Sequence, residues 1–200
     1  MTLADMSPSP RILLLPGWLN SGDSHWQSRW EALHGHERVE QNDWTWPRRG
    51  DWMARLDEVL LGSDAPTVLV AHSLGCQLVA AWAAHSQHTA RVKAAMLVAP
   101  PDPEREDMPP NLYNWRPIVR QRLPFVSLGV TSSDDPYCAP ERAAQMLADW
   151  GCEHKSIGAR GHINGDSGLG DWPEGYAMLQ ALVWRAVVLP GPRDEPLNPP

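Results

Sequence analysis

Apolar residues in this chain follow two alternating patterns. Short uninterrupted apolar runs are typical of strands buried on both faces of a parallel sheet, and apolar residues spaced three or four positions apart are typical of one face of a helix. The clearest run, at 67–71, reads TVLVA and leads into a segment where Leu74, Leu78, Val79 and Trp82 recur at helical spacing. The sequence therefore predicts a buried strand that passes directly into a buried helix.

The same alternation covers the rest of the chain and predicts the order of its elements. Because strands alternate with helices throughout, right-handed βαβ units are expected. The predicted fold class is α/β, with a doubly wound, mostly parallel sheet, helices on both faces, and a site at the carboxyl ends of the strands. Strands are expected at 11–15, 37–42, 67–71, 94–99, 125–131 and 153–157, the second being polar enough for a sheet edge. Helices are expected from Ser24 with a capping box to Gln27, from about Trp52 to Gly62, after Ser73, from Glu141 to Trp150, and from Asp171 with Glu174.

Length and terminal composition predict one domain. A chain of 200 residues fits a single domain, which we place at 11–189. Residues 1–10 are expected to form a flexible N-terminus, and the Pro-rich, charged stretch 190–200 is expected to be disordered. The polar, Pro-rich stretch 103–122 is too short for a large lid, and we interpret it as a loop or small helical cap beside the pocket.

Charge and cysteine content exclude several classes of function. The net charge of -7 and the absence of a basic cluster argue against nucleic-acid binding. No apolar segment is long enough to cross a bilayer, so no membrane association is expected. The three cysteines have neither the even count of a disulfide framework nor the spacing of a metal site. We therefore expect a cytoplasmic protein that uses no metal and no cofactor, and the sequence indicates no protein partner.

The junction between the central strand and its helix carries a candidate nucleophile. Residues 71–75 read AHSLG, which is close to the G-x-S-x-G pattern of a nucleophile elbow, where a serine sits on a sharp turn between small residues. Ala71 replaces the first glycine of that pattern, which is a mild departure because the position needs only a small residue. An ordinary strand-to-helix turn is the alternative, since Ser and Gly are common in turns.

The rest of the chain supplies a candidate acid and a candidate base. A serine becomes a nucleophile only when a base takes its proton and a third group orients that base. In elbow-containing folds the acid follows a later strand and the histidine a still later one. The strand at 125–131 leads into Asp134 and Asp135, and the last strand leads into Gly161 and His162. The predicted base is therefore His162, and the acid is one of the two aspartates.

The oxyanion formed in acyl transfer needs two backbone N–H donors. One is predicted at Leu74, the first residue of the helix after Ser73, where N–H groups lack partners and the helix dipole favours negative charge. The other is predicted at Trp18, in the loop after the first strand. This loop is otherwise an ordinary turn, so the assignment depends on the elbow.

Three further residues are candidates for the wall of a substrate pocket: His25, Trp46 and Trp115. For His25, a structural role at the start of the first helix is an equal alternative. His72, although adjacent to Ser73, is expected to point away from it along the strand and to pack or form a hydrogen bond.

Several stretches of the chain, taken together, resemble a known family. They are LPGW followed by GDSHWQSRW, then VAHSLG, SSDDPYCAPERA and GHINGDSGLGDWPEG, and they extend over nearly all of 11–189. In these stretches the chain resembles the small α/β-hydrolases related to retinoblastoma-binding protein 9. The resemblance implies a small α/β-hydrolase fold with a minimal cap, a triad of Ser73, Asp135 and His162, and weak esterase activity. Asp135 is preferred to Asp134 because DPYCAP resembles the run that follows the catalytic acid in many α/β-hydrolases.

Pattern and resemblance together predict an activity. We expect a serine hydrolase that cleaves small carboxylic esters, or thioesters or amides, through an acyl-enzyme on Ser73. Hydrolysis of a C–C bond by the same triad is a further possibility. The alternative from another class is a protein-interaction module that keeps the fold with vestigial catalysis.

Overall fold

A computed structural model describes residues 10–188 of the chain. Apart from residue 10, the stretches predicted to be a flexible N-terminus (1–10) and a disordered tail (190–200) lie outside the described residues. Within the described range, no helix is both long enough and apolar enough to cross a membrane.

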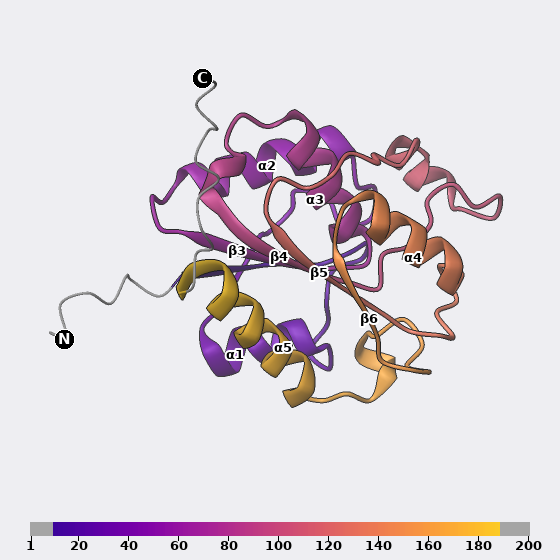
Figure 1. Cartoon of the computed structure of the whole chain (residues 1–200). Coiled ribbons are helices and arrows are strands. Elements are labelled where there is room, and N and C mark those ends of the chain that lie inside the picture. Colours follow the sequence, from indigo (N-terminus) through magenta and orange to yellow (C-terminus); the bar gives the residue numbers. More distant parts are fainter. Residues whose placement is uncertain (1–9, 189–200) are drawn as a thin grey trace, which may run out of the picture.

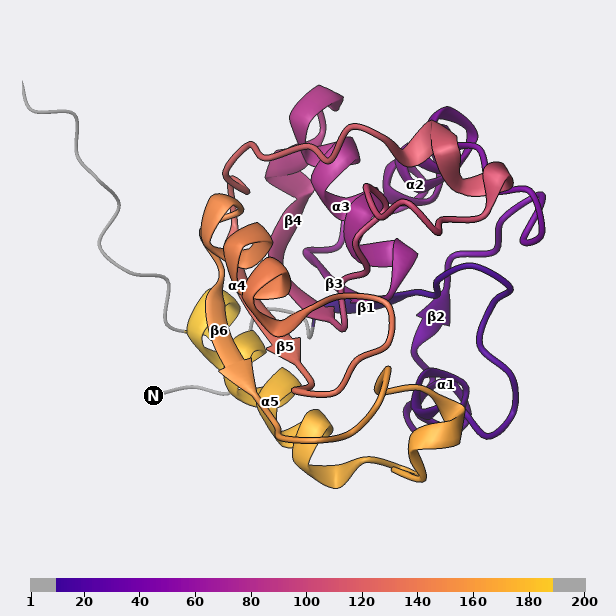
Figure 2. The same ribbon diagram turned by 90° about the vertical axis from the view of Figure 1, so that its right-hand side faces the viewer.

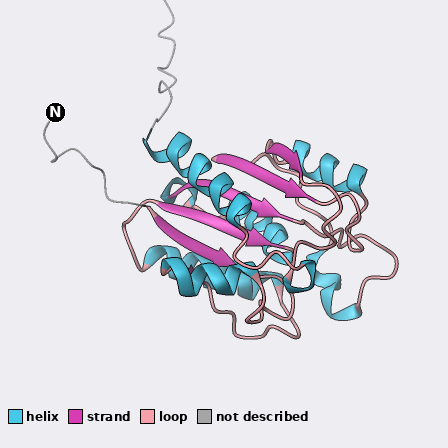
Figure 3. Cartoon of the chain, turned by 90° about the horizontal axis from the view of Figure 1, so that it is seen from below, coloured by secondary structure: helices cyan, strands magenta, loops and turns pink. Residues whose placement is uncertain are grey.

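The described residues build one sheet in which every neighbouring pair of strands is parallel. The strand order is β2-β1-β3-β4-β5-β6. In Figure 3 the arrows point the same way and lead to the end of the sheet where the long loops gather. The strands are β1 (Arg11–Leu15), β2 (Glu37–Arg38), β3 (Thr67–His72), β4 (Val92–Val98), β5 (Val126–Thr131) and β6 (Glu153–Ser156).

Helices cover both faces of this sheet, as Figure 1 shows. They are α1 (Trp26–His34), α2 (Arg49–Leu61), α3 (Leu74–His85), α4 (Pro140–Asp149) and α5 (Pro173–Val183), the last continued by a π-helical segment at Trp184–Val188. Side chains alternate along each strand, so β1 sends Leu13 and Leu15 into a core with α2, α3 and α4, and Ile12 and Leu14 into a second core with α1 and α5. Burial on both faces explains why the central strands are continuously apolar.

The strand order determines where a site can form. From β1 the chain passes outward to β2 on one side and then returns to β3 on the other, so the order of winding reverses between β1 and β3. In open α/β sheets, ligands bind beyond the carboxyl ends of the strands at such a reversal. The predicted doubly wound α/β class is confirmed, and the reversal lies where Ser73 follows β3.

Several predicted boundaries are wrong, and each has a local cause. The second strand covers only Glu37–Arg38 instead of 37–42, because just these residues pair with Leu13 and Leu14. The first helix is capped by His25, whose Nδ1 accepts a hydrogen bond from the Gln27 amide at 3.1 Å. The predicted capping box from Ser24 does not form, since the Gln27 side chain instead donates to the Val70 carbonyl of β3 at 3.0 Å.

The last helix also begins later than predicted. It starts at Pro173, and its N-cap is Trp172 rather than Asp171. The carboxylate of Asp171 is engaged elsewhere, because it forms an ion pair with Arg29 of α1. A charged partner on another helix has therefore displaced the expected local cap.

The stretch 103–122 forms a small cap with one short 3₁₀ helix, η3 (Pro110–Trp115). Figure 2 shows this helix beside α2. The Asn114 side chain accepts from the Arg49 amide at 2.7 Å, and the Trp115 indole donates to the Pro47 carbonyl at 2.9 Å. The other end of the cap is tied to α4, where Arg142 pairs with Asp102 and Glu104.

Candidate active site

Ser73 occupies a strained turn between β3 and α3. Its backbone has φ 54° and ψ −125°, a conformation that costs a residue with a side chain on the order of 1–3 kcal/mol. Two glycines allow the backbone around this turn to pack closely. A Cβ on Gly75 would overlap the carbonyl oxygen of Leu15, and a Cβ on Gly17 would lie 2.6 Å from Ser73 Cβ. Ala71, at the first position of the pattern, is fully buried in the core beneath. These features are those of a nucleophile elbow.

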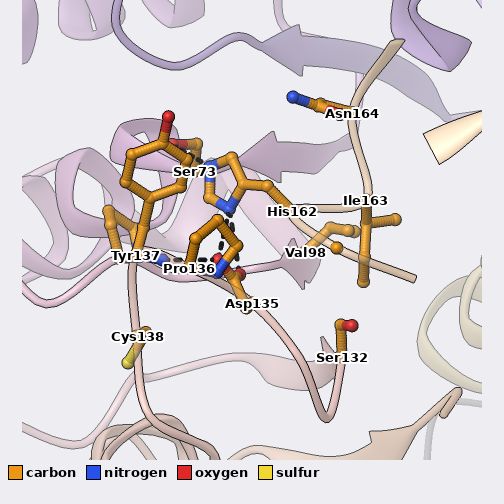
Figure 4. Close-up of polar contacts among 12 residues, drawn as sticks. Ser73, Val98, Ser132, Asp135, Pro136, Tyr137, Cys138, His162, Ile163 and Asn164 are labelled. Carbon is orange, nitrogen blue, oxygen red and sulfur yellow. Dashed lines mark hydrogen bonds and ion pairs between the residues drawn. The ribbon is translucent and has the colours of Figure 1, made fainter. Parts of the chain in front are cut away.

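Three side chains from separate loops form one chain of hydrogen bonds (Figure 4). Ser73 Oγ lies 2.8 Å from His162 Nε2, and His162 Nδ1 lies 2.9 and 3.0 Å from the two carboxylate oxygens of Asp135. Nδ1 faces a carboxylate and therefore carries the ring proton, which leaves Nε2 free to accept the serine proton. The serine follows β3, the aspartate follows β5 and the histidine follows β6.

The two adjacent aspartates have different partners. Asp135 faces His162 and also accepts from the Tyr137 amide at 2.9 Å. Asp134 has other partners: its Oδ1 accepts from the Ser132 hydroxyl and from the Gly161 amide, both at 2.7 Å. These two donors hold the pKa of Asp134 below its ordinary value. Asp134 thus ties the loop after β5 to the loop after β6, and Asp135 is the carboxylate that reaches His162.

The backbone amides beside Ser73 that have no acceptor within residues 10–188 include those of Leu74 and Trp18. Leu74 is the first residue of α3, where an amide has no intrahelical partner. In the loop after β1, the next amides are used, since Leu19 donates to the Trp44 carbonyl and Asn20 to the Gly17 carbonyl, both at 3.1 Å. The amide of Trp18, directly before these two in sequence, has no acceptor in the described part of the chain, while its indole donates to the Thr45 carbonyl at 3.0 Å.

A cavity of about 340 Å³ opens above Ser73 and His162. An apolar wall comes from Leu74 and the cap, and a polar wall comes from the loop that leads into α1 and from the loop after His162. Residues not singled out in the sequence complete both walls: Met108, Pro109, Leu112, Tyr137, Asn164 and Asp166. Tyr137 lies two residues after Asp135, and Asn164 lies two residues after His162. Their closeness in sequence to these two residues is the signal from which they could have been predicted.

Of the predicted pocket residues, His25 lines the cavity and the two tryptophans do not. Trp115 is buried with its indole bonded to Pro47 and its ring packed edge-on against Trp52 of α2. Trp46 lies in the preceding loop with 56% of its surface exposed. Both assignments are corrected: one tryptophan anchors the cap and the other faces solvent.

Two buried histidines, His25 and His72, form a row of rings that leads to His162. The rings of His25 and His72 are 4.6 Å apart, and those of His72 and His162 are 4.9 Å apart. Burial lowers the pKa of His25 to about 3 and holds the pKa of His72 well below its ordinary value. Both are therefore neutral near pH 7. His72 Nε2 donates to the His162 carbonyl oxygen at 2.9 Å, in line with the hydrogen-bonding role expected for it.

The remaining chemistry-bearing groups are far less suited to catalysis. Burial raises the pKa of Cys138 and of Cys152 to about 12, so both thiols stay protonated and weakly nucleophilic. Among residues 10–188, no three His, Cys, Asp or Glu side chains are grouped so as to hold a metal ion.

Comparison with known proteins places this geometry in a family. The model of the serine hydrolase family matches residues 12–181. Among solved structures, a YdeN-like hydrolase from Pectobacterium atrosepticum is 27% identical, with a TM-score of 0.78 over 90% of this chain and 94% of that one. The ydeN gene product of B. subtilis is 18% identical (TM-score 0.66, covering 86% and 98%), and the esterase RhEst1 from a Rhodococcus species is 12% identical (TM-score 0.67, covering 90% and 92%).

The solved structures and the family model support different conclusions. At 18% and 12% identity the likeness supports the fold alone, and no curated protein matches the chain. The family model, in contrast, covers most of the chain, from β1 to α5, and includes the elbow and the loops after β5 and β6. The family expected from the resemblance is thereby confirmed: the chain belongs to the serine hydrolase family.

Proposed function

We propose that this hydrolase cleaves small carboxylic esters through an acyl-enzyme on Ser73. Ser73 Oγ attacks the acyl carbon while His162 Nε2 takes its proton, and the negative charge passes to the former carbonyl oxygen. His162 then gives that proton to the leaving alcohol oxygen as its bond to carbon breaks. A water activated by the same nitrogen attacks the acyl-enzyme, and Ser73 recovers its proton when the acid leaves.

The unbroken hydrogen-bond chain from Ser73 through His162 to Asp135 is the observation that carries this proposal. Two supporting features act at the acyl oxygen. The unpaired amides of Trp18 and Leu74 are suited to receive the oxyanion, and each such donor contributes roughly 2.7–4 kcal/mol in the transition state.

The cavity supports small substrates with a neutral, apolar portion. A volume of about 340 Å³ accommodates a short acyl or alcohol group, and Leu74, Met108 and Leu112 give it an apolar wall. No lysine or arginine lines this cavity in the described part of the chain, so a carboxylate or phosphate on the substrate would meet no cation. Thioesters and amides present the same acyl carbon and belong in the same test. We also propose a reducing compartment such as the cytoplasm, because Cys76, Cys138 and Cys152 are free thiols.

A fluorophosphonate probe and a panel of short-chain esters, thioesters and amides test the proposal. We expect the wild type to be labelled and to turn over p-nitrophenyl esters, and Ser73→Ala to do neither. Asp135→Asn should lower kcat by roughly 10⁴, as loss of the orienting acid does in a triad. Asp134→Asn is the matched control, and kcat should stay within about tenfold of wild type because this carboxylate only joins two loops.

Three results would point elsewhere. A wild type that is neither labelled nor active on any substrate of the panel would favour the interaction module with vestigial catalysis. Equal labelling of wild type and Ser73→Ala would show that another residue is the nucleophile. Turnover confined to a substrate with a scissile C–C bond would keep the triad and replace the ester assignment.

A further inference from the structure

The turn that presents His162 is held in an unfavourable backbone conformation. Ile163, the next residue, has φ 48°, in the left-handed region that β-branched residues avoid. Its side chain is fully buried in the core shared by α1 and α5, so the turn cannot relax without unpacking that core. Conformations of this kind persist only where the surroundings hold them.

Two buried side chains hold the peptide carbonyls on either side of Ile163. His72 Nε2 donates to the His162 carbonyl at 2.9 Å, and Trp26 Nε1 donates to the Ile163 carbonyl at 2.8 Å. A carbonyl oxygen only accepts, so the His72 ring must carry its proton on Nε2. Both donors are almost completely buried, at 4% and 1% exposure.

These two donors belong to β3 and α1, whereas the turn that they hold follows the edge strand β6. His72 ends β3 directly before Ser73, and Trp26 begins α1. The bond from His72 therefore ties the backbone of the base to the strand end that carries the nucleophile. Asp135 acts on the other side, at the tip of the imidazole. The base is thus held at its ring by one loop and at its main chain by β3 and α1.

We propose that His72 and Trp26 are positioning residues that hold the strained Ile163 turn and so keep the imidazole of the base in line with the nucleophile. This inference rests on the proposed function, in which His162 is the base. Neither residue contacts the reacting atoms in this role. An error of about 1 Å in the position of a catalytic group costs on the order of 100-fold in rate, so a small relaxation of this turn is enough to be measured.

Four variants separate positioning from general destabilisation. His72→Phe and Trp26→Phe keep a ring in the core and remove one donor each. His72→Gln keeps an N–H donor at similar reach and is the conservative variant. Trp30→Phe is the matched control, because Trp30 is equally buried on the same helix and its indole donates at 2.7 Å to the Asp171 carbonyl, outside the catalytic turn.

Steady-state kinetics on a p-nitrophenyl ester give the first readout, with activity corrected for the folded fraction from urea denaturation. We expect His72→Phe and Trp26→Phe to lower kcat by roughly 10- to 100-fold with KM within about twofold. His72→Gln should recover most of the loss, and Trp30→Phe should keep the wild-type kcat. Wild-type kcat in both donor-deletion variants, or an equal loss in Trp30→Phe, would overturn the proposal.

Proton NMR gives a second readout that needs no turnover. The His162 Nδ1–H bonded to Asp135 should give a low-field signal, which is assigned by its absence from His162→Gln. We expect this signal to be lost or broadened in His72→Phe and Trp26→Phe and kept in His72→Gln and Trp30→Phe. A signal unchanged in all four variants would refute the positioning role, and this holds even if the wild type hydrolyses no substrate. Absence of hydrolysis by the wild type would instead refute the proposed function.

Discussion

Replacement of Gly17 by alanine tests how closely the loop after β1 approaches the nucleophile. A Cβ built on Gly17 lies 2.6 Å from Ser73 Cβ, 3.0 Å from Ser73 Oγ and 3.1 Å from the Leu74 amide nitrogen, whereas ordinary contacts begin at 3.4 Å. Relief of the worst overlap therefore needs a movement of about 0.8 Å. Either Ser73 moves away from His162, or the loop retreats and takes the Trp18 amide with it.

Both responses harm catalysis more than they harm the fold. A nucleophile displaced by about 1 Å costs roughly 100-fold, and the loss of one oxyanion donor costs roughly 10²–10³ in kcat, or about 2.7–4 kcal/mol. We therefore expect Gly17→Ala to lower kcat by about 10²–10³. Overpacking by one methyl group should lower the free energy of unfolding by only about 1–3 kcal/mol.

Ester hydrolysis, the rate of fluorophosphonate labelling and urea denaturation together check this prediction. Gly50→Ala is the neutral control, because nothing lies within 4 Å of a Cβ at that exposed position in α2. Gly75→Ala is the opposite control: its Cβ would overlap the backbone of β1, so stability and activity should fall together. A Gly17→Ala variant whose kcat stays within about threefold of wild type would refute the reasoning.

Three further predictions concern stability and the cap. Burial lowers the pKa of His25 to about 3 and that of His72 well below 6.5, so below pH 6.5 the unfolded chain binds protons that the folded chain does not. The free energy of unfolding should then fall as pH drops, with a slope approaching about 1.4 kcal/mol per pH unit for each histidine. Urea denaturation at pH 7 and 5 should show a smaller fall for His72→Gln than for the wild type, and equal falls would contradict this. Asp57 accepts from the Trp82 indole at 2.6 Å and from the Ser86 hydroxyl at 2.7 Å, so Asp57→Ala should cost about 1–3 kcal/mol of stability with kcat unchanged; a fall in kcat would show that α2 and α3 influence the site. Arg142→Met, which frees one end of the cap, should cost under about 1 kcal/mol because these ion pairs are partly exposed, yet it should raise KM severalfold; an unchanged KM would show that the cap does not depend on them.

The fold was predictable where burial alone decides the structure. The run at 67–71 is apolar because β3 is buried on both faces, and no other partner competes for it. Prediction failed where a side chain had a choice of partners. Gln27 bonds to β3 rather than to a helix cap, and Asp171 pairs with Arg29 rather than capping the last helix. Such choices depend on residues that are distant in sequence, which a local pattern does not contain.

In the candidate site, too, some features could be predicted from the sequence and others depend on distant partners. The order of serine, acid and histidine at successive strand ends follows from topology, and the structure brings Ser73, Asp135 and His162 together as that order requires. The pocket assignment of Trp115 was wrong because a buried indole N–H needs an acceptor, and this one donates to the Pro47 carbonyl. The assignment of Trp46 was wrong because its side chain faces solvent. The bond from Trp26 to Ile163 spans 137 positions, and no pattern within either segment indicates it.

His162 follows an exposed edge strand of the sheet. β6 is a four-residue edge strand with every residue exposed, and it pairs only with β5 among the described strands, whereas β3 is buried throughout and lies between β1 and β4. Stability differs across a protein, and a short exposed edge opens before a buried centre does. As the temperature rises, β6 should therefore open first, and the histidine loop that it leads into is then held only by the buried contacts of its turn with β3 and α1. We expect the alignment of His162 with Ser73 to weaken in this partly opened form, so activity should end at a lower temperature than the folded structure.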